Sequence, residues 1–145
     1  MFKQSVIFSA FALLGLAPAA AADLSVRVAG IKPGKGPLFV SVQKREDFMS
    51  DRSSHARKID APAAGDQVVV FPNVAPGTYA VSVWQDSDGN GQFSTTPEGM
   101  PTDGWAMTNA ERLRGEPKFD QVSTEIGSRA VALTLPMQYY ATPAR

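Results

Sequence analysis

Residues 66–84 read DQVVVFPNVAPGTYAVSVW and carry the clearest strand pattern in the chain. Two runs in this stretch, residues 66–71 and 78–84, are rich in the valine and aromatic residues that favour the pleated surface of a β-strand. Between them, Pro76-Gly77 is typical of a tight turn in which proline fixes its φ angle and glycine takes a positive φ. The stretch therefore predicts two consecutive strands joined by a turn.

Strand patterns continue on both sides of this stretch. Apolar and polar residues alternate, or apolar β-formers gather, in five further runs: residues 24–29, 38–43, 57–60, 119–125 and 130–135. The glycine-rich segment 30–36 predicts that the first two of these runs form a hairpin. About seven short strands without a long helical pattern predict an all-β protein, a single antiparallel β-sandwich with one long polar loop at residues 86–118. The predicted core is Leu24, Val26, Val28, Leu38, Val40, Val42, Phe71, Tyr79, Val81, Val83, Val131, Leu133 and Leu135.

The N-terminus has the layout of a signal peptide. Lys3 supplies a positive charge, residues 6–16 are apolar, and Ala20-Ala21-Ala22 fits the small-residue cleavage rule. We expect residues 1–22 to be cleaved, leaving residues 23–145 as one domain without a membrane span and placing the protein in the periplasm or outside the cell. An uncleaved membrane anchor is the alternative interpretation.

Composition excludes several classes of function. The chain has no cysteine, which rules out disulfides, thiol nucleophiles and thiolate metal sites. Its 14 basic and 14 acidic residues balance, which argues against nucleic acid or an anionic membrane as the main partner, because either would call for a basic patch.

The long loop opens with a motif typical of cation binding. Asp86, Asp88 and Asn90 have the spacing of positions 1, 3 and 5 of a calcium loop, Gly91 stands at the sharp turn, and Gln92 would offer its backbone oxygen. The bidentate glutamate expected at position 12 is missing, because Pro97 stands there and Glu98 follows one residue late. Glu98 or Asp103 would have to complete the shell around Ca²⁺. Without that glutamate we expect a weak, structural calcium site.

Two features of the loop have a second interpretation. Aspartate, asparagine and glycine also gather in turns without a metal, because Asx side chains bond nearby backbone amides. Trp84 and Trp105 could form an aromatic platform for a ligand, or a small core under the loop together with Phe93, Met100 and Met107. His55 lies in a polar segment, where a solvated side chain is the simplest interpretation.

The chain also resembles a known family. Phe71–Val83, Asp86–Gly91, Gly99–Pro101, Asp103–Asn109 and Pro117–Phe119 are similar, in this order, to motifs of the domain of unknown function 2141 family of small exported bacterial proteins. The resemblance implies export, an immunoglobulin-like or prealbumin-like sandwich and a shared polar loop. Members often carry histidine where Gln85 stands, so the resemblance implies an all-oxygen site here, which suits Ca²⁺ better than a transition metal.

Two functions follow from these observations. The first is a noncatalytic exported module whose calcium-stabilised loop binds a protein or glycan partner, since loops at the ends of sandwiches commonly carry binding sites. The second is a hydrolase that uses two carboxylates of residues 86–103. We expect the first, because no serine–histidine–acid set is recognisable outside the poorly placed His55.

Overall fold

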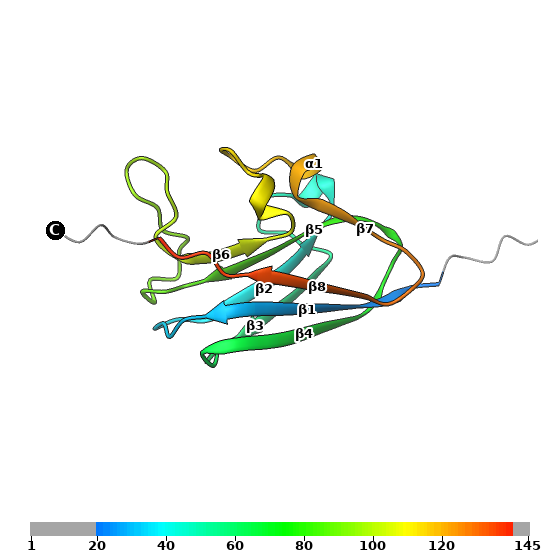
Figure 1. Cartoon of the computed structure of the whole chain (residues 1–145), viewed down its shortest axis with the longest axis horizontal. Coiled ribbons are helices and arrows are strands. Elements are labelled where there is room, and N and C mark those ends of the chain that lie inside the picture. The colour runs from blue at the N-terminus through cyan, green and yellow to red at the C-terminus, as the bar shows by residue number, and fades with distance from the viewer. Residues whose placement is uncertain (1–19, 141–145) are drawn as a thin grey trace, which may run out of the picture.

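The fold is known from a computed structural model, which describes residues 20–140 (Figure 1). These residues form eight strands: β1 Ala22–Ile31, β2 Leu38–Gln43, β3 His55–Ile59, β4 Gly65–Val74, β5 Gly77–Gln85, β6 Gly104–Met107, β7 Ser123–Ile126 and β8 Val131–Pro136. Helix in this described range is limited to the four-residue α1, Phe119–Val122, and two 3-10 turns, Arg45–Asp47 and Ala110–Arg112. The chain is mostly β, as predicted.

The strands form two sheets. One has three strands in the order β4-β1-β8, and the other has five, in which β3-β2-β5-β6 lie side by side and β7 also pairs with β5. All pairs are antiparallel except β1 with β8, which run parallel. The prediction of a purely antiparallel sandwich is therefore wrong for one pair. The C-terminal strand reaches β1 by a crossover from the other sheet, and a crossover permits a parallel pair.

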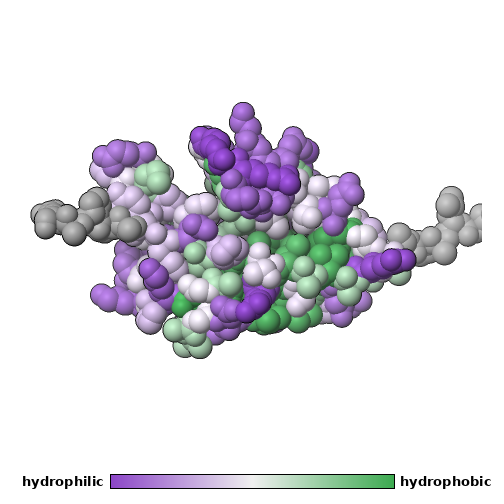
Figure 2. Space-filling view, viewed as in Figure 1, coloured by the Kyte–Doolittle hydropathy of each residue, from purple (hydrophilic) through white to green (hydrophobic). Residues whose placement is uncertain are grey.

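One hydrophobic core lies between the sheets. Alternate residues of β1 and β4 from one sheet and of β2 and β5 from the other point inward and are buried in a single cluster. Each such valine or leucine contributes about 1.5–3 kcal/mol by leaving water. Of the predicted core, Val131 and Leu133 are half-buried on β8 and pack against the cluster, and the others are buried. On the outer surface, hydrophobic residues are also visible where β8, β1 and β4 run across the molecule (Figure 2).

The expected hairpin of β1 and β2 does not form. β1 pairs with β4 and β8, whereas β2 pairs with β3 and β5 in the other sheet. Segment 30–36 is thus a connection between sheets. The alternation of apolar and polar residues in β1 and β2 shows that one face of each strand is buried. This alternation is the same whether the two strands are hydrogen-bonded neighbours or face each other across the core.

The Pro76-Gly77 turn also joins the two sheets. Gly77 does not have a positive φ, so the predicted turn type is wrong. Its lack of a side chain serves another purpose, because a Cβ there would lie 3.3 Å from Cε2 of Tyr79. The buried Tyr79 donates its hydroxyl proton to the backbone oxygen of Ala75 at 2.7 Å and so braces the turn.

Three local predictions need correction. Residues 119–125, expected as a strand, begin with α1 and continue as β7. β6 was not predicted, because its four residues lie within the long polar loop. The edge strand expected at residues 57–60 begins at His55. His55 therefore lies in a strand and not in a polar loop, and the centroid of its ring is 6.1 Å from that of Phe71.

A second, smaller cluster covers part of the outer face of the five-stranded sheet. Ala80 and Met107 from the sheet pack there against Phe119 and Val122 of α1. No helix within residues 20–140 is long and apolar enough to cross a membrane. The expected signal peptide falls almost wholly outside the described residues, and Ala22 is the first residue of β1.

Candidate functional site

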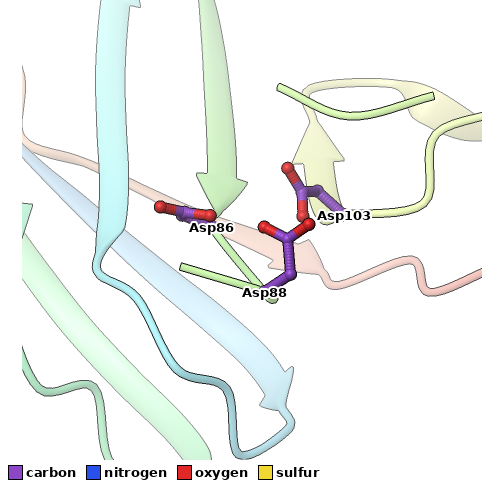
Figure 3. Close-up of side chains that lie close together, drawn as sticks. All are labelled: Asp86, Asp88 and Asp103. Atoms are coloured by element: carbon purple, nitrogen blue, oxygen red, sulfur yellow. The ribbon is translucent and has the colours of Figure 1, made fainter. Parts of the chain in front are cut away.

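The candidate site lies where β5 ends and β6 begins. Gln85 and Gly104 are the last register pair of these antiparallel strands, so Asp86 and Asp103, the next residues outward, emerge side by side. Asp88 follows two residues after Asp86 and turns back toward them (Figure 3). Each of the three aspartates offers one carboxylate oxygen, and these atoms lie within 4.8 Å of one another.

Asp86 is almost completely buried, with 2% of its surface exposed. Its Oδ1 accepts hydrogen bonds from the amides of Gly89 at 3.0 Å and Asn90 at 3.1 Å, and its Oδ2 accepts one from Gly91 at 2.8 Å. Gly89 and Gly91 both have a φ of 77°, a conformation that glycine adopts without strain. The Asp-Gly-Asn-Gly sequence therefore wraps three amides around one carboxylate, which offsets the cost of burying its charge.

Asp103 is buried to the same degree, with 1% exposed, and ties three parts of the loop together. Its Oδ1 accepts the amide hydrogen of Ser87 at 3.1 Å. Its Oδ2 accepts the indole N–H of Trp84 at 2.9 Å and the amide hydrogen of Ser94 at 3.0 Å. The carboxylate thus connects the end of β5, the start of the loop and its middle.

The remaining predicted ligands lie further out. Asp88 is exposed and accepts hydrogen bonds from the amide and the side chain of Asn90 at 3.1 and 3.0 Å. The side-chain oxygen of Asn90 accepts the amide hydrogen of Gln92, and the backbone oxygen of Gln92 accepts the hydroxyl hydrogen of Ser94. Glu98 is exposed in the turn of a small hairpin, closed by the bridge between Thr95 and Pro101, and is not one of the clustered carboxylates.

A third segment forms a wall of the site and was missed by sequence reasoning. The amide of Gly36 donates to the backbone oxygen of Asp86 at 2.9 Å, and the amide of Asp86 donates to the oxygen of Pro37 at 3.0 Å. A Cβ on Gly36 would lie 2.6 Å from that Asp86 oxygen and 2.8 Å from its Oδ2. Gly36 is therefore needed for a close approach to the carboxylate, whereas the sequence suggested only a turn.

Within the described part of the chain, the three carboxylates have no cationic partner. None of the ion pairs among residues 20–140 includes Asp86, Asp88 or Asp103. Two unit charges 4.8 Å apart repel by about 0.9 kcal/mol in water and about 3.5 kcal/mol at an effective dielectric constant of 20. All the donors are oxygens, the ligands that hard cations prefer. The cluster could therefore hold a metal ion, which would remove this repulsion.

The two tryptophans lie beside this cluster as a register pair on β5 and β6. The ring of Trp84 stacks on Phe39 with centroids 4.8 Å apart, and the ring of Phe93 meets it edge-on at 6.3 Å. Trp105 packs against the second cluster and lines a hollow of about 230 Å³ with Met100, Pro101, Gln138, Tyr139 and Tyr140. Trp84 thus buttresses the loop through its ring and its bond to Asp103, whereas Trp105 borders the hollow.

Comparison with known proteins identifies the family but no characterised relative. Neither the curated proteins nor the solved structures contain a match to this chain. Residues 26–134, which include all three aspartates, match the model of a family described as "Uncharacterized protein conserved in bacteria (DUF2141)". The chain belongs to this family.

Proposed function

We propose that this protein is an exported, noncatalytic β-sandwich module whose loop is stabilised by Ca²⁺ and binds a protein or glycan partner in the periplasm or outside the cell. The observation that carries the proposal is the convergence of Asp86, Asp88 and Asp103 within 4.8 Å, two of them buried. Buried carboxylates need compensation, and a divalent cation would supply the charge that their N–H donors only partly offset.

The hydrogen bonds of the loop leave acceptor positions on the three carboxylates free for a cation. A carboxylate has about four acceptor positions. Asp86 and Asp103 each accept three hydrogen bonds and Asp88 accepts two, so each retains a lone pair for a metal. Ca²⁺ takes six to eight oxygens in a flexible geometry, which water, the Gln92 carbonyl and Asn90 could complete.

The fold supports a binding role. We propose that the sandwich is immunoglobulin-like. Support comes from the bond from Tyr79 to the Ala75 oxygen at a turn between the sheets, which resembles the tyrosine corner of that group. The loop lies at one end of the sandwich and exposes Phe93 and Met100 by 50% and 53%. Loops placed on a rigid scaffold in this way commonly bind partners.

A calcium titration tests the proposal. We expect a Kd of about 10⁻⁴–10⁻³ M, the range of extracellular calcium modules, and a stabilisation of about 1.4 kcal/mol at tenfold excess over Kd. Asp88→Ala should abolish this calcium-dependent gain and leave the sandwich folded, because Asp88 is exposed outside the core. Asp60→Ala is the matched control, since that carboxylate is exposed and belongs to no cluster.

The outcomes separate the alternatives. No heat of binding and identical melting in calcium and chelator would contradict the calcium site and leave a metal-free turn. Turnover of a glycoside or ester panel, lost in Asp88→Asn, would identify a hydrolase instead. Calcium-dependent retention on immobilised polysaccharides would favour a glycan over a protein partner.

A further inference from the structure

The C-terminal segment crosses from one sheet to the other beside the candidate site. β8 belongs to the three-stranded sheet, and the amide of Met137, just after it, still donates to Ala29 of β1 at 2.9 Å. One residue later, Gln138 exchanges two backbone hydrogen bonds with Trp105 of β6, at 3.0 and 2.6 Å. Figure 1 shows this segment, after β8, lying alongside β6. The chain therefore ties the two sheets together at the base of the loop.

Tyr139 closes a ring of hydrogen bonds at this place. Its hydroxyl accepts the amide hydrogen of Lys32 at 2.8 Å and donates its own proton to Oε1 of Gln85. The Gln85 amide group in turn donates to the backbone oxygen of Lys32 at 2.7 Å. Gln85 is fully buried, so the two bonds of its side chain satisfy polar atoms that water cannot reach.

The ring of Tyr139 also lies against the partner strand. A Cβ on Gly104 would lie 2.4 Å from Cε1 and 3.0 Å from Cδ1 of this ring, so only glycine permits the contact. Gln85 and Gly104 are the register pair next to Asp86 and Asp103. Tyr139 thus contacts the two residues that adjoin the buried aspartates in the sequence.

We propose that Tyr139 is a positioning residue that clamps the base of the loop, acting through Gln85 and Gly104 to hold Asp86 and Asp103 at their separation. The clamp keeps the carboxylates close and preorganises them for a cation, and this last step rests on the proposed calcium function. Loss of a side chain with only a packing role would destabilise the whole domain. Loss of this ring of bonds should instead loosen the ends of β5 and β6, from which the loop extends.

Amide hydrogen exchange in chelator tests the clamp without any metal. Tyr139→Phe removes one hydroxyl and leaves the buried Gln85 oxygen without its donor. The amides of Gly89, Asn90, Gly91 and Ser94, which bond to the two carboxylates, should then exchange about 5- to 150-fold faster. The amides of β4, which bond to no residue of this ring, serve as the internal reference and should not change. Tyr140→Phe is the matched control, because the neighbouring tyrosine is 40% exposed.

Two results would overturn the clamp. Unchanged exchange of the loop amides would show that the hydroxyl does not hold the loop, and equal acceleration throughout the domain would show a merely structural role. Gln85→Met, which removes the bond shared with Tyr139 and the bond to the Lys32 oxygen at similar side-chain volume, is a second variant in case Tyr139→Phe fails to fold. The two substitutions should be non-additive in their effect on loop exchange, since they break one network.

Calcium affinity provides a separate readout. Where the unsubstituted protein binds calcium, Tyr139→Phe should raise Kd by a factor similar to the change in loop exchange, and an unchanged Kd would overturn the preorganising role. Where the unsubstituted protein shows no calcium response, the proposed function fails, and the exchange experiment in chelator still decides the clamp.

Discussion

Replacing Gly36 by alanine measures how closely the 34–37 segment approaches the acidic site. The new methyl group would lie 2.6 Å from the backbone oxygen of Asp86 and 2.8 Å from its Cγ and Oδ2. Ordinary carbon–oxygen contacts are about 3.3–3.6 Å, so the segment must retreat by roughly 0.5–1 Å or lose its bond to Asp86. The Asp86 oxygen cannot move aside alone, because it accepts the Gly36 amide hydrogen while the amide of the same residue donates to Pro37. Overpacking of this kind costs about 1–3 kcal/mol.

Gly127→Ala is the matched control for this substitution. Both glycines lack a positive φ, and a Cβ on Gly127 would have no neighbour within 4 Å. Both variants gain about 0.4–1 kcal/mol from the stiffer unfolded chain, so their difference isolates the steric cost. At about 3–5 °C per kcal/mol for a domain of this length, Gly36→Ala should melt roughly 3–15 °C below Gly127→Ala in calorimetry or circular dichroism. Equal melting temperatures would refute the close approach of Gly36 to Asp86.

Three further predictions concern the rest of the chain. Gly77→Val should lower stability by about 1–3 kcal/mol in a denaturant titration, because its side chain would displace Tyr79 from the Ala75 oxygen, and an unchanged midpoint would contradict this account. The Gly30 amide and the Arg27 guanidinium hold the pKa of Asp66 below its ordinary value, so its carboxylate stabilises the fold above the unfolded-state pKa and loses this effect as pH falls through the lower folded-state pKa. The stability difference between the natural protein and Asp66→Asn should therefore shrink on acidification below about pH 4, and a difference independent of pH would be inconsistent with this ion pair. If the expected signal peptide is cleaved, N-terminal sequencing of the mature protein should begin at or near Asp23, and a mature chain that retains Met1 would contradict cleavage.

The strands could be predicted because apolar and polar residues alternate along them, and this local pattern shows which residues are buried. β2 has the predicted bounds, and β5 differs from its prediction by one residue at each end. Their partners could not be predicted in the same way. Alternation shows which face of a strand is buried but not which strand lies beside it. The hairpin predicted for β1 and β2 is therefore wrong, because the two strands lie in different sheets. The parallel pairing of β8 with β1 depends on a crossover that leaves no local pattern.

The candidate site was predictable in its first half. Asp86 and Asp88 follow a spacing that reflects how a short loop turns around a cation, and the structure brings both together with Asp103. Gly36, Gln85 and Tyr139 were missed as parts of the site because their roles depend on contacts between distant segments. Gln85 did carry a signal. It continues the inward series of Tyr79, Val81 and Val83, and a polar residue at an inward position needs a buried partner.

The hydrogen bonds of the site also determine how a cation would act. Asp86 and Asp103 together accept six N–H hydrogen bonds, so the loop has a defined path before any metal arrives. The loop would then lose little conformational entropy when a cation binds. The binding free energy would come mainly from relief of the repulsion among the three carboxylates. The missing bidentate glutamate limits affinity, whereas the preformed loop raises it. A calcium effect should therefore be concentrated in the exchange of loop amides, with only a modest change in global melting.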